Sequence, residues 1–188
     1  MSTITIAYGD GFGPAVMEAA LTVLREAGAN ITIETIEIGS RIYSMGSKTG
    51  ILPSAWKALE KNRVLLKAPV IVPEGCRETG EVIREYFGLE KATDNIWKNE
   101  SFALFEPIYA AECWEQKPAT LDPSPMIHAA VALLEHIGQP RIADKITAAL
   151  QRTITENIHL KERKRLSRMT DAITEKLAIP TNSISSML

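Results

Sequence analysis

The segment from Gly9 to Pro14, with glycines at alternate positions, has the strongest chemical signature in the chain. It follows an apolar run and precedes a helical pattern, so we expect a turn from a strand into a helix. Glycine allows positive φ angles and close backbone approach, and Pro14 suits the first turn of a helix. An isolated GxGxG pattern is nevertheless more typical of a tight turn packed through glycine than of a binding loop.

The elements around this turn alternate between strand and helix. Apolar residues recur at helical spacing from Val16 to Leu24, and Gly28 is placed to end that helix. β-Branched residues alternate from Ile31 to Ile38, which predicts a second strand. A short helix over residues 53–60 and a buried strand over residues 64–68 follow. This order predicts an α/β fold with at least some parallel strands.

The pattern is less regular after residue 73. We expect a loop over residues 74–80, a helix over 82–89, a polar irregular stretch over 90–101 and an apolar strand over 102–108. Three more helices are then predicted: one from Ser124 to Ile137, a second after Pro140, and a short one over residues 170–177. In the second, four side chains spaced four residues apart predict one buried stripe: Ile142, Ile146, Leu150 and Ile154.

A chain of 188 residues can bury one sizeable core, so no second full domain is expected. We assign residues 1–178 to one α/β domain and 179–188 to a flexible tail. The net charge of −2 gives no overall attraction to nucleic acid or to a membrane surface. The chain has no apolar run long enough to span a bilayer and no signal-peptide pattern at its start, so a cytoplasmic location is expected.

The cysteines, histidines and basic residues show no clear site. Cys76 and Cys113 lack metal-ligand spacing and are expected to be free thiols, and the three histidines share no ligand spacing either. Residues 161–168 hold five basic side chains among eight. A solvated helix face or a linker is a more typical origin of such a run than a site for an anionic partner.

Several ordered motifs resemble those of the isocitrate/isopropylmalate dehydrogenase family, and most closely its isocitrate dehydrogenase branch. The stretch from Thr3 to Ala19 is similar to the family's amino-terminal signature. The resemblance continues through Thr-Gly-Ile at 49–51 and Lys-Ala-Pro at 67–69, and it resumes with Phe-Ala-Leu-Phe-Glu-Pro at 102–107.

This resemblance implies the large α/β domain of such an enzyme without its smaller central domain. Residues 94–97 resemble the family sequence before the missing part, and Asn95-Ile96 also fits the sequence after it. We therefore expect the two halves to join near residues 92–100. In the family, the missing segment carries an arginine, a tyrosine, a lysine and the metal-binding aspartates, and it supplies much of the dimer contact.

The resemblance places two residues in the family's substrate site. Arg84 matches a substrate arginine, and Glu78 stands where the family has a serine, although counting forward from Pro73 places Gly80 there instead. A carboxylate at Glu78 would repel a tricarboxylate substrate. Trp97 stands in the place of a further arginine.

The same resemblance indicates the cofactor positions. The family binds NAD or NADP together with Mg²⁺ or Mn²⁺, and its adenosine loop is replaced here by Tyr-Ala-Ala-Glu-Cys at 109–113, with the loop length preserved. We expect no cofactor to be retained, and we assign no catalytic or metal-binding residue. The vestigial cofactor positions are Asp10, Gly11, Phe12, Thr49, Tyr109 and Asp122.

These replacements predict a catalytically inactive descendant that binds a protein partner or ligand, or forms a non-standard homo-oligomer. The alternative is an NAD(P)- and metal-dependent isocitrate dehydrogenase, in which an intact subunit could supply the absent groups. A third hypothesis, binding of polyanions through residues 161–168, predicts salt-sensitive retention.

Overall fold

Six strands form one mixed sheet in the order β2-β1-β3-β6-β5-β4 in the computed structural model, which describes residues 2–156 and 165–178. Neighbours among β1, β2, β3 and β6 run parallel, and β4 and β5 are antiparallel. This arrangement confirms the predicted α/β class. The strands are β1 (Ser2–Ala7), β2 (Ile31–Ile36), β3 (Val64–Lys67), β4 (Glu90–Thr93), β5 (Ile96–Lys98) and β6 (Ala103–Phe105).

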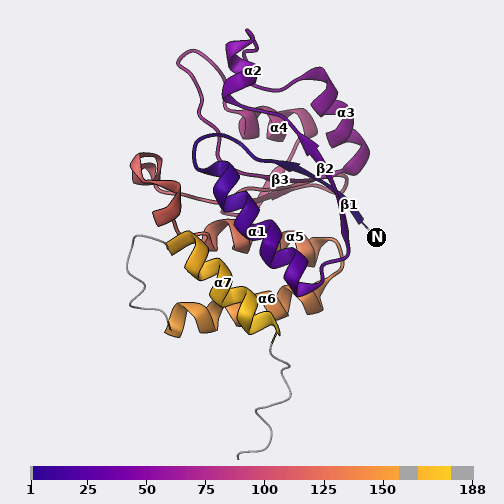
Figure 1. The fold of residues 1–188 in the computed structure, drawn as a ribbon. Helices are drawn as coiled ribbons and strands as arrows, with labels where there is room; N and C mark the ends of the chain where they lie inside the picture. Colours follow the sequence, from indigo (N-terminus) through magenta and orange to yellow (C-terminus); the bar gives the residue numbers. More distant parts are fainter. Residues whose placement is uncertain (1, 157–164, 179–188) are drawn as a thin grey trace, which may run out of the picture.

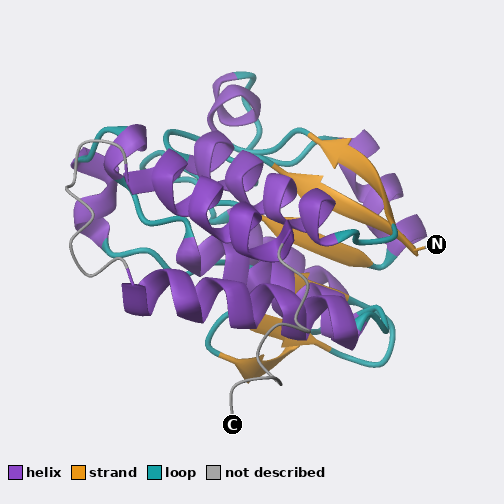
Figure 2. Cartoon of the chain, turned by 60° about the horizontal axis from the view of Figure 1, so that its bottom comes forward, coloured by secondary structure: helices purple, strands orange, loops and turns teal. Residues whose placement is uncertain are grey.

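Helices cover both faces of this sheet (Figure 1). They are α1 (Gly13–Ala27), α2 (Ser40–Ser44), α3 (Pro53–Asn62), α4 (Thr79–Phe87), α5 (Ser124–His136), α6 (Pro140–Glu156) and α7 (Arg165–Ala178), with two 3-10 helices, η1 (Ala111–Glu115) and η2 (Pro118–Thr120). Helices α1, α5, α6 and α7 pack together on one side, where Figure 2 shows them in front of the strands. Helices α3 and α4 lie on the other side.

Each face has its own apolar core, because successive residues of a strand point to opposite faces. Ile4 and Ile6 of β1 belong to the core beneath α1 and α5. Leu65 of β3 and Leu104 of β6 belong to the core beneath α3 and α4. The sheet is therefore the middle of three layers, and its strand ends are free to carry functional groups.

The glycine turn has the predicted geometry. Helix α1 begins at Gly13 with a proline in its first turn, and it ends at Gly28 in the left-handed conformation, with φ of 85°. Gly9 has φ of 65°, and a β-carbon there would lie 2.0 Å from the carbonyl oxygen of Pro69. The turn requires glycine at position 9 because the backbone that follows β3 lies directly against it.

The expectation of an irregular stretch over residues 90–101 was wrong. Strands β4 and β5 form an antiparallel hairpin there, and β5 pairs with β6, so this segment extends the sheet by two strands. The side chains of β4 are all exposed. A short polar strand of this kind lacks the apolar alternation by which strands are predicted from sequence.

Other boundaries differ modestly from expectation. In α6, Ile146 and Leu150 are buried, whereas Ile154 is 47% exposed, so the predicted stripe is shorter than four residues. Helix α7 begins at Arg165, five residues before the predicted start. The tail at 179–188 and the basic residues at 161–164 lie outside the described residues.

Candidate functional site

The central feature of the candidate site is a lysine at the carboxyl end of β3. Leu66 of β3 pairs with Phe105 of β6, so Lys67 and Glu106 end neighbouring parallel strands side by side. The Lys67 side chain is only 6% exposed, and its Nζ lies 2.9 Å from Glu106 Oε1. Ligands of parallel α/β sheets bind at this edge, beyond the carboxyl ends of the strands.

Helix α4 brings two more charged side chains to the same place. Glu78 is its N-cap and accepts hydrogen bonds from the backbone amides of Gly80 and Glu81, at 2.8 and 2.6 Å. The Glu78 carboxylate also lies 3.1 Å from Lys67 Nζ. Arg84 donates to Glu106 Oε2 at 2.7 Å, and its other terminal nitrogen lies 3.6 Å from Glu78 Oε2. We call these four side chains, Lys67, Glu78, Arg84 and Glu106, the ion-pair network.

The network is self-neutralising, because it contains two cations and two carboxylates. Burial by itself would lower the pKa of Lys67, but Glu106 and Glu78 outweigh it and raise that pKa. Burial would likewise raise the pKa of Glu78, but Lys67 and the two cap amides lower it to about 2. Both groups therefore stay charged over the physiological pH range.

Trp97 and Gly80 also pack against side chains of the network. The guanidinium of Arg84 lies over the Trp97 ring of β5, 4.6 Å from the ring centroid, which is a cation–π contact. A β-carbon on Gly80 would lie 2.2 Å from Glu106 Oε1, so the carboxylate occupies the space that a side chain would need. Trp97 thus supports the position of Arg84.

A cavity of about 260 Å³ lies beside the network. The four charged side chains form one part of its wall. The rest is lined mainly by apolar and aromatic groups: Pro69, Val70, Asp94, Pro107, Ile108, Tyr109 and Trp114.

Three predicted cofactor positions lie in the glycine turn, next to Trp114. The Asp10 carboxylate accepts hydrogen bonds from the backbone amides of Ser40 and Ile71, so it ties two loops together. A β-carbon on Gly11 would lie 3.0 Å from the Trp114 ring. The Phe12 ring contacts Trp114, with centroids 4.7 Å apart. An indole of the protein itself therefore covers this turn.

The other three cofactor positions also have internal partners. Tyr109 lines the cavity and packs edge-on against Phe12, and burial raises its pKa, so its hydroxyl stays protonated. Asp122 accepts from the backbone amide of Ser124 and pairs with Arg165 of α7. The backbone amide of Thr49 donates to the hydroxyl of Ser47. Of the six positions, Tyr109 alone lines the cavity, so the structure does not bring all six together there.

Lys67 and Glu106 were not predicted as site residues, although both lie in motifs that carry the family resemblance. A signal was present, since Lys67 directly follows the apolar run Val64–Leu66 and Glu106 directly follows another. A charged residue at the end of a buried strand commonly marks a site. The charge pairing could not be read from the sequence, because the four residues are brought together from three elements.

The residues present do not fit the metal-chelated anionic substrate of the family. In the parts of the chain that the structure describes, no three histidine, cysteine, aspartate or glutamate side chains are grouped to hold a metal ion. The two cations of the network already have carboxylate partners.

Among the residues that the structure describes, no helix is both long and apolar enough to cross a membrane. Cys76 and Cys113 are free thiols, as predicted.

Comparisons with known proteins relate part of the chain to isocitrate dehydrogenases. The NADP isocitrate dehydrogenase of Rickettsia bellii is 50% identical over 72 residues, which are 38% of this chain and 15% of that protein. The Thermus thermophilus NADP enzyme is 37% identical over 75 residues, covering 40% of this chain and 15% of that protein. The bovine mitochondrial NAD isocitrate dehydrogenase subunit alpha is 33% identical over 73 residues, covering 39% and 20%. No family model matches the chain.

Solved structures extend the similarity to nearly the whole fold. The TT0538 protein of Thermus thermophilus matches with a TM-score of 0.82 and 14% identity, over 96% of this chain and 69% of that one. Isocitrate dehydrogenase of Methylococcus capsulatus matches with a TM-score of 0.79 and 14% identity, over 94% and 99%. The sequence matches span only 15 to 20% of the relatives named above. The chain is therefore similar in sequence to isocitrate dehydrogenases over about two fifths of its length, spans only a fraction of the length of these relatives, and shares its fold with solved structures such as the Methylococcus capsulatus enzyme.

Proposed function

We propose that this protein is a non-catalytic descendant of an isocitrate dehydrogenase and acts by binding a protein partner. The ion-pair network is the observation that carries the proposal. Its two cations lie at the carboxyl ends of the strands, where an anionic substrate would bind, and Glu78 and Glu106 already occupy them.

Binding of a substrate carboxylate would have to displace one of these internal carboxylates. Displacement would separate Glu106, whose side chain is 15% exposed, from Lys67 and Arg84, and a buried carboxylate without a cationic partner carries an uncompensated desolvation cost of several kcal/mol. Because Glu78 also caps helix α4, its displacement would expose two backbone amides as well. An anionic substrate should therefore bind less favourably here than in an enzyme whose substrate-binding arginines have no internal carboxylate partner.

The hairpin of β4 and β5 supports the same proposal. We infer that it closes the junction left by loss of the family's central segment, since it joins the helix that carries Arg84 to the strand that precedes Glu106. The hairpin pairs with β6 along three residues and places Trp97 under Arg84. The junction thus stabilises the neutralised network.

Hydride transfer tests the proposal directly. The purified chain is mixed with isocitrate, Mg²⁺ or Mn²⁺, and NAD or NADP, and reduced cofactor is followed by absorbance, with an intact isocitrate dehydrogenase as the positive control. We expect no turnover above the protein-free rate. Turnover by the chain alone would overturn the proposal.

A second arm uses the chain mixed with the intact enzyme. An increase in rate above that of the intact enzyme by itself would support the heteromeric alternative, in which a complete subunit supplies the missing groups. An unchanged rate, together with separate elution of the two proteins in gel filtration, would exclude that alternative.

A further inference from the structure

We propose that the cavity beside the network, with the apolar side chains at its mouth, is a docking site for a partner-protein segment that carries one large apolar side chain between basic residues. The inference rests on the proposed binding function and specifies the chemistry of the partner.

Exposed apolar side chains gather at this cavity. Seven large hydrophobic residues are exposed in the described part of the chain, and three of them are Ile71, Ile108 and Trp114, at 47, 60 and 39%. Ile108 and Trp114 line the cavity. Ile71 and Trp114 both lie within 4 Å of the position that a β-carbon on Gly11 would take, so they adjoin one another. We call these three residues the apolar rim; contiguous exposed patches of this kind mark interaction sites.

Trp114 is held in a defined position before any partner arrives. Its ring packs on Phe12, with centroids 4.7 Å apart, and lies against Gly11. Phe12 is itself buried and contacts Tyr109 edge-on. A preformed aromatic anchor loses little conformational entropy on binding, which is a property of residues that dominate interface affinity.

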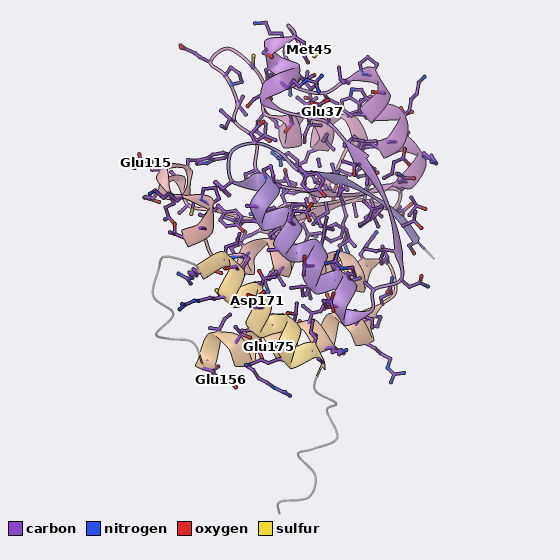
Figure 3. All side chains as sticks on the ribbon, in the orientation of Figure 1. Glu37, Met45, Glu115, Glu156, Asp171 and Glu175 are labelled. Atoms are coloured by element: carbon purple, nitrogen blue, oxygen red, sulfur yellow. The ribbon has the colours of Figure 1, made fainter. Side chains whose placement is uncertain are left out.

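The charges around the rim favour a basic segment. Glu112 and Glu115 flank Trp114 in η1 and are exposed, whereas Asp94, which lines the cavity, is paired with Lys91 at 2.7 Å. Figure 3 shows Glu115 at the end of a loop that projects from the body of the molecule. Lys117 offsets one of these charges, but the cations of the network are already paired. The charge available to a partner is therefore predominantly negative.

The size of the cavity favours a side chain over a free ligand. Small-molecule sites usually enclose about 300–1,000 Å³. The volume here is about 260 Å³, and the cavity opens onto an apolar rim instead of closing around a ligand. One phenylalanine, leucine or methionine side chain would fill much of it, while the flanking backbone lies across Ile108 and Trp114.

Three pools of short dye-labelled peptides test the proposal by fluorescence anisotropy with the full chain. One pool combines phenylalanine with lysine and arginine, the second phenylalanine with aspartate and glutamate, and the third serine with lysine and arginine. We expect saturable binding of the first pool alone, weakened by added salt. Equal binding of the second or third pool, or no binding of the first, would overturn the proposal.

Variants then locate the site. Ile108→Ser removes an exposed rim residue without disturbing the core, and we expect it to weaken binding about tenfold. Glu112→Gln combined with Glu115→Gln should weaken binding and reduce its salt dependence. Met45→Ser is the matched control, since Met45 is 64% exposed and lies well away from Glu115 in Figure 3. Unchanged binding by the Ile108 variant would refute this location.

The docking site and the non-catalytic role can be refuted independently of one another. A chain that binds none of the peptides and also shows no hydride transfer would refute the docking site and leave the non-catalytic role standing. Hydride transfer by a chain that binds the basic apolar peptides would refute the non-catalytic role alone.

Discussion

Glu78 shows how a single side chain can change the character of an anion site. Its carboxylate caps helix α4 and also pairs with Lys67, and a serine at this position could do only the first. A serine hydroxyl could also accept the cap hydrogen bonds, but it would leave Glu106 as the one carboxylate for the two cations, Lys67 and Arg84. The identity of this one residue therefore decides whether the network is neutral or carries one net positive charge.

The acid dependence of stability should report on Glu78. Its pKa falls from 4.5 to about 2 on folding, so the folded state gains stability from the carboxylate above about pH 4.5 and loses that gain as the pH falls toward 2. Glu78→Gln lacks the gain at every pH. We expect the difference in free energy of unfolding between wild type and variant, measured in urea, to shrink between about pH 4.5 and 2. A difference that stays constant over this range would contradict the assigned ion pair.

Removal of the buried lysine should cost far more than removal of an exposed one. Lys67→Met leaves Arg84 as the one cation facing Glu78 and Glu106, and loss of one partner from a buried ion pair costs about 3–5 kcal/mol. Lys61 pairs with Glu34 at the surface with a side chain 69% exposed, so Lys61→Met should cost less than about 1 kcal/mol. Chemical unfolding of the two variants provides the comparison, and similar losses would show that the network contributes little.

At the scale of elements, two connections position the site. The glycine turn lets the chain leave β1 and enter α1 while the backbone after β3 lies against it, with the Asp10 amide donating to the Pro69 carbonyl at 2.8 Å. The β4–β5 hairpin gives the sheet its antiparallel edge and carries Trp97 to Arg84. The first connection was predictable from glycine spacing, whereas the second depends on pairing with β6.

A β-carbon in the turn should be far more damaging than one in an open loop. Gly9 and Gly46 both have positive φ, 65° and 95°, but only Gly9 has backbone within reach, at 2.0 Å. Gly46→Ala should cost about 1–2 kcal/mol from its φ angle alone. Gly9→Ala should exceed the roughly 3 kcal/mol that bounds most substitutions. Thermal unfolding measures both, and equal losses would mean that the turn can open without penalty.

At the scale of the whole molecule, the last described helix completes the core begun by the first. Helix α7 packs against α1 and α6, and its Met169, Ile173 and Leu177 are buried in the core that also holds β1. Its first residue, Arg165, pairs with Asp122 in the segment between η2 and α5. The last described helix thus packs against the first, and this contact couples the stability of the helical layer to that of the sheet.

Truncation of α7 side chains should test this coupling. Ile173 is fully buried, so Ile173→Ala should destabilise the protein by about 2–5 kcal/mol through lost burial and a cavity. Ile154 of α6 is 47% exposed, and Ile154→Ala should change stability by about 0.5 kcal/mol at most. Guanidinium unfolding resolves the difference. A small loss at Ile173 would show that α7 is not part of the cooperative core.

The sequence alone determined the α/β class, the glycine turn and most helices, because these follow from local periodicity and from the backbone freedom of glycine. It also indicated the family through motifs that include residues 67–69 and 102–107. The tertiary structure alone decided that Lys67, Glu78, Arg84 and Glu106 neutralise one another, and that the polar segment at 90–98 forms a hairpin. Charge pairing and strand pairing are contacts between distant segments, so no local pattern encodes them.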